Sequence, residues 1–188
     1  MFELLIALGA NLPKDESGLA LTLTRALGLL EDRAHIKVVR HSRWYSTPAY
    51  PPGSGPAFVN GAAALRSVLS PEEILHILHD VEAELGRERP VRWGPRVCDL
   101  DLLGAGQEIL PDVASVKRWM SLDDQAAQES APEQLVLPHP RLHLRAFVLV
   151  PLKDIAPGWY HPVLQLTVSE MLARLSPEET AMVKPLPD

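Results

Sequence analysis

The chain has little cysteine, few aromatic residues and no long hydrophobic run. A single cysteine, Cys98, excludes an internal disulfide framework and fits a reducing compartment. The apolar run that opens the sequence has no basic leader and is too short to span a membrane, so it is interpreted as a buried strand. A cytoplasmic location is the simplest expectation.

The sequence also lacks a basic excess and the common phosphate-binding fingerprints. Its formal net charge of −6 argues against broad binding to nucleic acids or anionic membranes, where a basic face is usual. There is no Walker A loop, no Gly-x-Gly-x-x-Gly after the first strand and no protein-kinase motif. If the protein binds phosphate, its side chains must therefore hold it.

What is present fits one globular domain of mixed structure. The chain has 188 residues, of which 46% are hydrophobic, enough for a real core. We expect a domain over residues 1–176, an insertion at about 111–133 with one short helix, and a Pro-rich tail over 177–188. Strands are predicted at Phe2 to Leu8, Ile36 to Tyr45, Phe58 to Leu65 and around Asp99 to Leu103, with helices from Ser17, Pro71 and Val168. This β-α-β-β-α-β order favours an α+β sandwich.

A loop separates the second and third predicted strands. The segment from Thr47 to Pro56 contains four prolines and two glycines, a composition that excludes regular structure. Loops of this kind are often lids over a binding site, and a plain surface connection is the alternative.

The stretch from Arg92 to Leu103 carries the strongest chemical signal. Asp99 and Asp101 are two residues apart in a predicted strand, so their carboxylates project from the same face. Two adjacent anions require a cation, and ligation by oxygen alone is typical of Mg²⁺. The alternative is an edge strand with both carboxylates in water. Because Val97, Leu100 and Leu102 indicate a buried strand, we favour the functional interpretation.

Arginines gather before this strand. One guanidinium group can bind two phosphate oxygens at once, so an arginine cluster beside a magnesium-binding pair of aspartates suggests phosphoryl-type transfer. The alternative interpretation is a solvated basic turn. The cluster consists of Arg87, Arg89, Arg92 and Arg96.

Other candidate side chains carry weaker signals. His139 lies between two prolines that restrict its backbone, which suits a hydrogen-bonding or proton-handling role, although a lone histidine is more often structural. Phe58 and Phe147 are normally core residues and gain interest only if they flank a planar ligand. Cys98 is interpreted as a small core residue. The remaining histidines are interpreted as structural because their spacing suits no metal site: His35, His41, His76, His79, His143 and His161.

Several ordered motifs together resemble one known family, the 6-hydroxymethyl-7,8-dihydropterin pyrophosphokinases. The resemblance covers most of residues 1–157. Its strongest parts are Arg92-Trp93-Gly94-Pro95-Arg96 before Asp99-Leu100-Asp101, and Leu137-Pro138-His139-Pro140-Arg141-Leu142 running on to Arg145-Ala146-Phe147. Supporting parts are Ala7-Leu8-Gly9-Ala10-Asn11, Tyr45-Ser46-Thr47-Pro48 and Phe58-Val59-Asn60.

The resemblance implies a fold, a reaction and a site. The fold would be a ferredoxin-like three-layer α/β/α sandwich with an antiparallel-rich sheet. The enzyme would transfer pyrophosphate from ATP to the hydroxymethyl group of the pterin and release AMP, in folate biosynthesis. Asp99 and Asp101 would hold two Mg²⁺ ions, and Arg87 and Arg96 would steady the transferring group. The resemblance implies ATP contacts from Glu82, Arg89, Arg92, His139 and Arg145, and pterin contacts from Thr47, Pro48, Phe58, Asn60, Trp93, Asp99 and Phe147.

Three points depart from the family pattern. The segment 111–133 is longer than the usual short hairpin, so its contacts with ATP cannot be carried over. The Arg89-Pro90-Val91-Arg92 spacing leaves open which arginine reaches the nucleotide, and no phosphate contact is assigned to Gln134.

Two rival functions remain to be distinguished. A non-catalytic nucleotide-binding module of the same fold is the main alternative. A metal-dependent nuclease is disfavoured by the acidic net charge. The expected partners are ATP and the pterin, with no nucleic acid and no membrane, and we expect a monomer.

Overall fold

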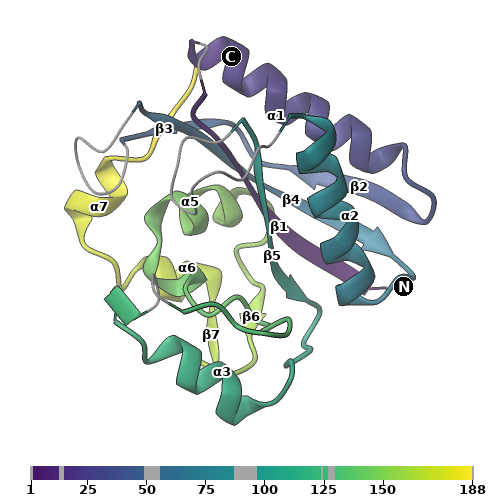
Figure 1. Cartoon of the computed structure of the whole chain (residues 1–188). Helices are drawn as coiled ribbons and strands as arrows, with labels where there is room; N and C mark the ends of the chain where they lie inside the picture. Colours follow the sequence, from purple (N-terminus) through teal and green to yellow (C-terminus); the bar gives the residue numbers. More distant parts are fainter. Residues whose placement is uncertain are drawn as a thin grey trace.

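The computed structural model describes residues 2–12, 15–48, 56–86, 97–123, 125–126 and 130–187. Within these ranges, the first half contains five strands and two helices, and the elements of the second half are mostly shorter (Figure 1). The elements of the first half are β1 (Phe2–Ala10), α1 (Glu16–Glu31), β2 (Ile36–His41), β3 (Tyr45–Thr47), β4 (Phe58–Ser67), α2 (Pro71–Glu84) and β5 (Asp99–Ala105). Those of the second half are α3 (Val113–Met120), the 3₁₀ helix η1 (Leu142–Leu144), α5 (Ala146–Ile155), β6 (Tyr160–His161), β7 (Leu166–Thr167), α6 (Val168–Leu172), α7 (Pro177–Ala181) and β8 (Lys184–Pro185).

The main sheet is antiparallel throughout its named strand pairs. Its strands follow the order β5-β1-β4-β3-β8, and β2 also pairs with β4. The strand β1 therefore lies between β4 and β5, although these strands are far apart in the sequence.

Helices cover both faces of this sheet. On one face, α1 and α2 pack over a core that includes Leu4, Leu8 and Leu78. On the other face, α5 and α6 enclose a second core that includes Leu149 and Met171. Figure 1 shows the two helix layers on opposite sides of the sheet. The predicted three-layer α+β architecture is confirmed.

Local sequence signals set the helix starts. Ser70 and Glu73 form a capping box at the start of α2, and Thr167 and Glu170 form one at the start of α6. In both boxes the side-chain oxygens accept hydrogen bonds from backbone N–H groups that a helix leaves unsatisfied. A third box, at Ser176, opens α7.

Two predicted boundaries are wrong. The strand expected over Ile36 to Tyr45 is two strands, because the Ser42 hydroxyl accepts from Ala62 N (2.9 Å) and donates to Arg43 O (2.6 Å). Between the end of β2 and the start of β3, these side-chain bonds interrupt the regular backbone hydrogen bonding to β4. The sequence also predicts that a segment from Leu142 to Val150 ends at Pro151, whereas α5 continues past this proline to Ile155. Burial of its apolar face against the second core compensates for the hydrogen bond that proline cannot donate.

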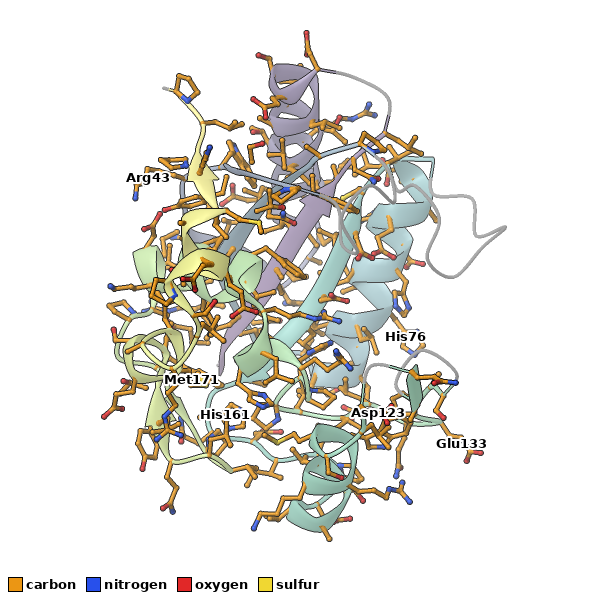
Figure 2. The ribbon with its side chains drawn as sticks, turned by 90° about the vertical axis from the view of Figure 1, so that its left-hand side faces the viewer. Arg43, His76, Asp123, Glu133, His161 and Met171 are labelled. Carbon is orange, nitrogen blue, oxygen red and sulfur yellow. The ribbon has the colours of Figure 1, made fainter. Side chains whose placement is uncertain are left out.

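The insertion and the tail are also structured. The insertion contains α3, as predicted, and Figure 2 shows Asp123 and Glu133 near this helix at the outer surface. The tail adds β8 to the free side of β3, and Leu186 N donates to Trp44 O (2.9 Å). The tail of residues 177–188 thus joins the sheet of the preceding domain. Over the described ranges, no helix is both long enough and apolar enough to cross a membrane.

Candidate active site

A small pocket opens where β1, β4 and β5 meet the start of α5. Its polar wall comes from Asn60 on β4 and from Asp99 and Asp101 on β5. Between these strands, β1 contributes only small side chains on this face, at Ala7 and Gly9. The lining consists of Ala7, Leu8, Gly9, Asn60, Asp99, Asp101, Phe147 and Val148.

The strand β5 presents the two carboxylates side by side. Asp99 lies opposite Gly9 and Asp101 lies opposite Ala7, so both side chains share one sheet face. The intervening Leu100 points to the opposite core. Asp99 and Asp101 are half-buried, which leaves their oxygens accessible from the pocket. The predicted carboxylate pair therefore exists as a geometric unit.

A third carboxylate, from α2, binds the backbone of the same strand. Glu82 on α2 is 1% exposed, and its Oε1 accepts a hydrogen bond from Leu100 N (2.7 Å). Among the described strands β5 lies at the edge of the sheet, so none of them pairs with it on that side, and the helix supplies the acceptor for this N–H. Glu82 thus fixes the backbone between the two aspartates. Its predicted contact with ATP stays a prediction.

The amide of Asn60 is held in one orientation. Its Nδ2 donates to Thr47 Oγ1 (2.7 Å), and both residues are buried. This bond places the nitrogen toward β3 and the oxygen toward Gly9. A buried amide oxygen is an acceptor that suits the N–H donors of a heterocyclic ring.

The strand β3, which carries Thr47, is tied to α5, which carries Phe147. The Tyr45 hydroxyl donates to Asp154 Oδ2 (2.7 Å). Burial raises the pKa of Tyr45, so this hydroxyl keeps its proton and remains a donor. Arg43, at the edge of the molecule in Figure 2, contacts the same carboxylate (3.3 Å). These contacts therefore join β3 to α5 at a point distant from the opening of the pocket.

The start of α5 provides the aromatic and cationic wall. Phe147 lines the pocket, and the guanidinium carbon of Arg145 lies 5.6 Å from the centre of its ring. Such a cation–π contact fixes both groups at the mouth of the pocket. The arrangement brings a flat apolar surface and a positively charged guanidinium group together.

His139 is a neutral donor in this environment. Burial lowers its pKa to about 3, and the positive charges of Arg145 and Arg141 act in the same direction. Its Nδ1 accepts from Arg141 N (3.2 Å), which leaves the proton on Nε2. The loop is anchored to β5 because His139 N donates to Leu103 O (2.9 Å). His139 is therefore suited to donate a hydrogen bond from Nε2.

The predicted site residues fall into three groups. Asn60, Asp99, Asp101 and Phe147 line the pocket together, and Thr47, His139 and Arg145 adjoin them through the contacts above. Phe58 is half-buried and pairs with Thr47, whereas Pro48 is exposed, and neither belongs to the described lining. Apart from Glu82, which contacts β5 from α2, the others lie outside the described residues: Arg87, Arg89, Arg92, Trp93, Arg96 and most of the loop from Thr47 to Pro56.

Four lining residues have no role predicted from the sequence: Ala7, Leu8, Gly9 and Val148. The available signal was the alternation of small Ala7 and Gly9 with bulky Ile6 and Leu8 in β1. Small side chains two residues apart indicate a sheet face that something approaches closely.

Comparison with known proteins gives one consistent answer. A sequence model of the family described as 7,8-dihydro-6-hydroxymethylpterin-pyrophosphokinase matches residues 5–157. The 2-amino-4-hydroxy-6-hydroxymethyldihydropteridine pyrophosphokinase of Methylorubrum extorquens is 37% identical over 172 residues, which are 92% of each chain. The Synechocystis protein of the same name is 37% identical over 142 residues, or 76% of this chain and 62% of its own length.

Solved structures agree at the level of the fold. A crystal structure of a Plasmodium falciparum HPPK-DHPS triple mutant aligns with a TM-score of 0.67 at 16% identity. The alignment covers 97% of this chain and 46% of that chain, so the chain spans about half the length of the larger protein. From the match over residues 5–157 and these relatives, the chain belongs to the 7,8-dihydro-6-hydroxymethylpterin-pyrophosphokinase family.

Proposed function

We propose that the protein transfers pyrophosphate from ATP to the hydroxymethyl group of 6-hydroxymethyl-7,8-dihydropterin, in folate biosynthesis. The observation that carries this proposal is one pocket in which a fixed amide, an aromatic ring and a carboxylate pair face each other. The amide and the ring suit a flat heterocycle, and the carboxylate pair suits a metal–phosphate group. Names of the relatives support the same reaction.

The carboxylate pair fits Mg²⁺. Both donors are oxygen atoms, they project from one face of β5 and they are accessible from the pocket. Among the residues that the structure describes, no group of three or more His, Cys, Asp or Glu side chains could hold a metal. Further ligands are therefore expected from water and ATP oxygens. Asp99 and Asp101 would hold two ions, and bound Mg²⁺ would neutralise phosphate charge.

The reaction requires one bond to form and one to break. The acceptor hydroxyl oxygen forms a bond to the β-phosphorus of ATP, and the bond from that phosphorus to the oxygen bridging to the α-phosphate breaks. AMP leaves with the bonding electron pair, and the hydroxyl proton passes to solvent. Asn60 and Phe147 orient the acceptor. His139 donates from Nε2 to a phosphate oxygen, and Arg145 supplies positive charge beside it.

Several parts of the proposal rest on residues outside the described ranges. By resemblance, Arg87 and Arg96 steady the transferring group, and Trp93 contacts the pterin. Either Arg89 or Arg92 contacts ATP. These roles suit the chemistry of guanidinium groups with phosphate.

The experiment mixes the purified protein with ATP, MgCl₂ and 6-hydroxymethyl-7,8-dihydropterin and separates nucleotides by chromatography. AMP should appear in equal amount to the pterin diphosphate. The matched control replaces the acceptor by 7,8-dihydropterin, which lacks the hydroxymethyl group and should give no AMP. Formation of ADP instead, or binding of ATP without AMP release, would contradict the proposal and favour the non-catalytic module.

A further inference from the structure

Gly9 lies between two polar residues of the pocket, one on each neighbouring strand. On one side it lies directly opposite Asn60 of β4, and on the other it lies directly opposite Asp99 of β5. Opposed residues of an antiparallel sheet share one face, so Asn60, Gly9 and Asp99 form a row across three strands. Neighbouring strands are about 4.8 Å apart, so the outer two backbones are separated by roughly 10 Å.

A side chain at position 9 would press against the Asn60 amide. A Cβ atom built on Gly9 lies 3.0 Å from Asn60 Oδ1, closer than such atoms normally approach. The same test on Gly28 in α1 finds no atom within 4 Å. A Cβ atom on Gly61 or Gly104 would meet a tryptophan, Trp44 or Trp159, so Gly9 differs in meeting a side chain that lines the pocket.

Movement of the Asn60 amide away from position 9 would weaken its hydrogen bond to Thr47. Asn60 Nδ2 donates to Thr47 Oγ1 at 2.7 Å, and each residue is 6% exposed. Rotation away from position 9 would stretch or break this bond, and a buried polar group left without its partner is costly. A methyl group at position 9 would therefore require the amide to shift by a few tenths of an ångström against this bond, whereas hydrogen requires no shift.

We propose that Gly9 is a positioning residue of the acceptor pocket, which acts by leaving the space that Asn60 Oδ1 requires. Its effect on catalysis rests on the proposed function, because Asn60 reads the acceptor ring. Its effect on the Asn60 amide does not depend on the reaction.

The test compares Gly9→Ala with the matched control Gly28→Ala. Gly9→Ala should lower kcat/KM for the pterin by roughly 10- to 100-fold, the size of one lost buried hydrogen bond, while KM for ATP changes by about twofold or less. Gly28→Ala should leave kcat/KM for the pterin and KM for ATP unchanged. Equal losses toward both substrates, or no loss, would overturn the proposal.

A double-mutant cycle shows whether Gly9 acts through Asn60. In an Asn60→Ala background, adding Gly9→Ala should change kcat/KM for the pterin by less than about threefold. An undiminished effect would mean that the added methyl obstructs the ligand directly, which overturns the positioning role. If Gly9→Ala alone fails to fold, the double variant should fold again, and its failure would also overturn the proposal.

A spectroscopic readout separates this inference from the proposed function. The side-chain amide signal of Asn60, identified by its loss in Asn60→Ala, should shift in Gly9→Ala and stay unchanged in Gly28→Ala. This result is expected whether or not AMP is formed. An unmoved signal would overturn the positioning role even in an active enzyme, whereas absence of AMP in the wild type would overturn only the reaction.

Discussion

At the scale of single residues, the carboxylate pair can be tested separately from the fold. Asp99→Asn and Asp101→Asn keep the size of each side chain and remove one negative charge. Because both residues are half-buried in a pocket wall and not in either core, the fold should survive. Each variant should lose roughly 100-fold or more in kcat, since metal–phosphate stabilisation contributes several kcal/mol.

The matched control for this pair is Asp80→Asn, an exposed aspartate of α2. It makes the same chemical change away from the pocket and should retain full activity. Initial rates as a function of Mg²⁺ concentration, together with thermal unfolding, measure all three variants. Near-normal turnover in either pocket variant would remove that carboxylate from the metal site.

At the scale of elements, Arg40 joins the sheet to the end of α5. Its Nε donates to Ile155 O (2.7 Å), and its two terminal nitrogens contact the carboxylate of Glu3 (2.9 and 3.3 Å). Ile155 is the last residue of α5, whose final carbonyls lack partners within the helix. Arg40 thereby holds the helix that carries Phe147 against β1 and β2.

We expect Arg40→Ala to lower the free energy of unfolding by about 1–2 kcal/mol, mostly from the hydrogen bond to Ile155. The control is Arg33→Ala, which removes the exposed Arg33–Glu84 ion pair (2.7 Å) and should cost less than about 0.5 kcal/mol. Urea unfolding at fixed pH measures both. Equal losses would show that the helix-end contact adds nothing beyond a surface ion pair.

Local sequence patterns predicted the helices and strands better than they predicted which strands pair with each other. The strand predicted over Phe58 to Leu65 is present, and the period of two in a strand puts Val59 and Leu65 in one core and Ala62 and Ala64 in the other. The Asp99 and Asp101 pair followed from the same rule. The row of Asn60, Gly9 and Asp99 could not be predicted from those patterns, because it depends on pairing between distant strands. The short strand β8 was missed because two residues carry no period.

At the scale of the whole molecule, buried histidines make stability sensitive to acid. Burial lowers the pKa of His161 to about 4, with a smaller contribution from the nearby His143. His161 is fully buried, as Figure 2 places it within the fold, and its Nδ1 accepts from Val163 N and Leu164 N (3.3 and 3.1 Å). Its Nε2 has no partner among the described residues.

The sign of this effect follows from the lowered pKa. Below the ordinary value of about 6.5, the unfolded chain binds a proton at His161 while the folded chain does not. This contribution to stability is therefore complete above about pH 6.5 and is lost as the pH falls toward about 4, by up to about 1.4 kcal/mol per pH unit.

His161→Asn should reduce that acid sensitivity. An asparagine side chain can accept from the same backbone N–H groups and does not titrate in this range. The free energy of unfolding, measured with urea between pH 7 and 4.5, should fall less steeply for the variant than for the wild type. His76→Asn makes the same change on the exposed surface of α2 and should run parallel to the wild type. Identical slopes for His161→Asn and the wild type would contradict the assignment.

The position of β5 at the edge of the sheet has a further consequence for the behaviour of the protein at high concentration. An exposed edge is a template on which another chain can add a strand and begin aggregation. Here the outward N–H of Leu100 is already bound by Glu82, and charged aspartates flank it on either side. An incoming strand would have to displace a buried carboxylate and approach two negative charges. The groups that prepare the pocket for metal and phosphate therefore also protect this edge against edge-to-edge association.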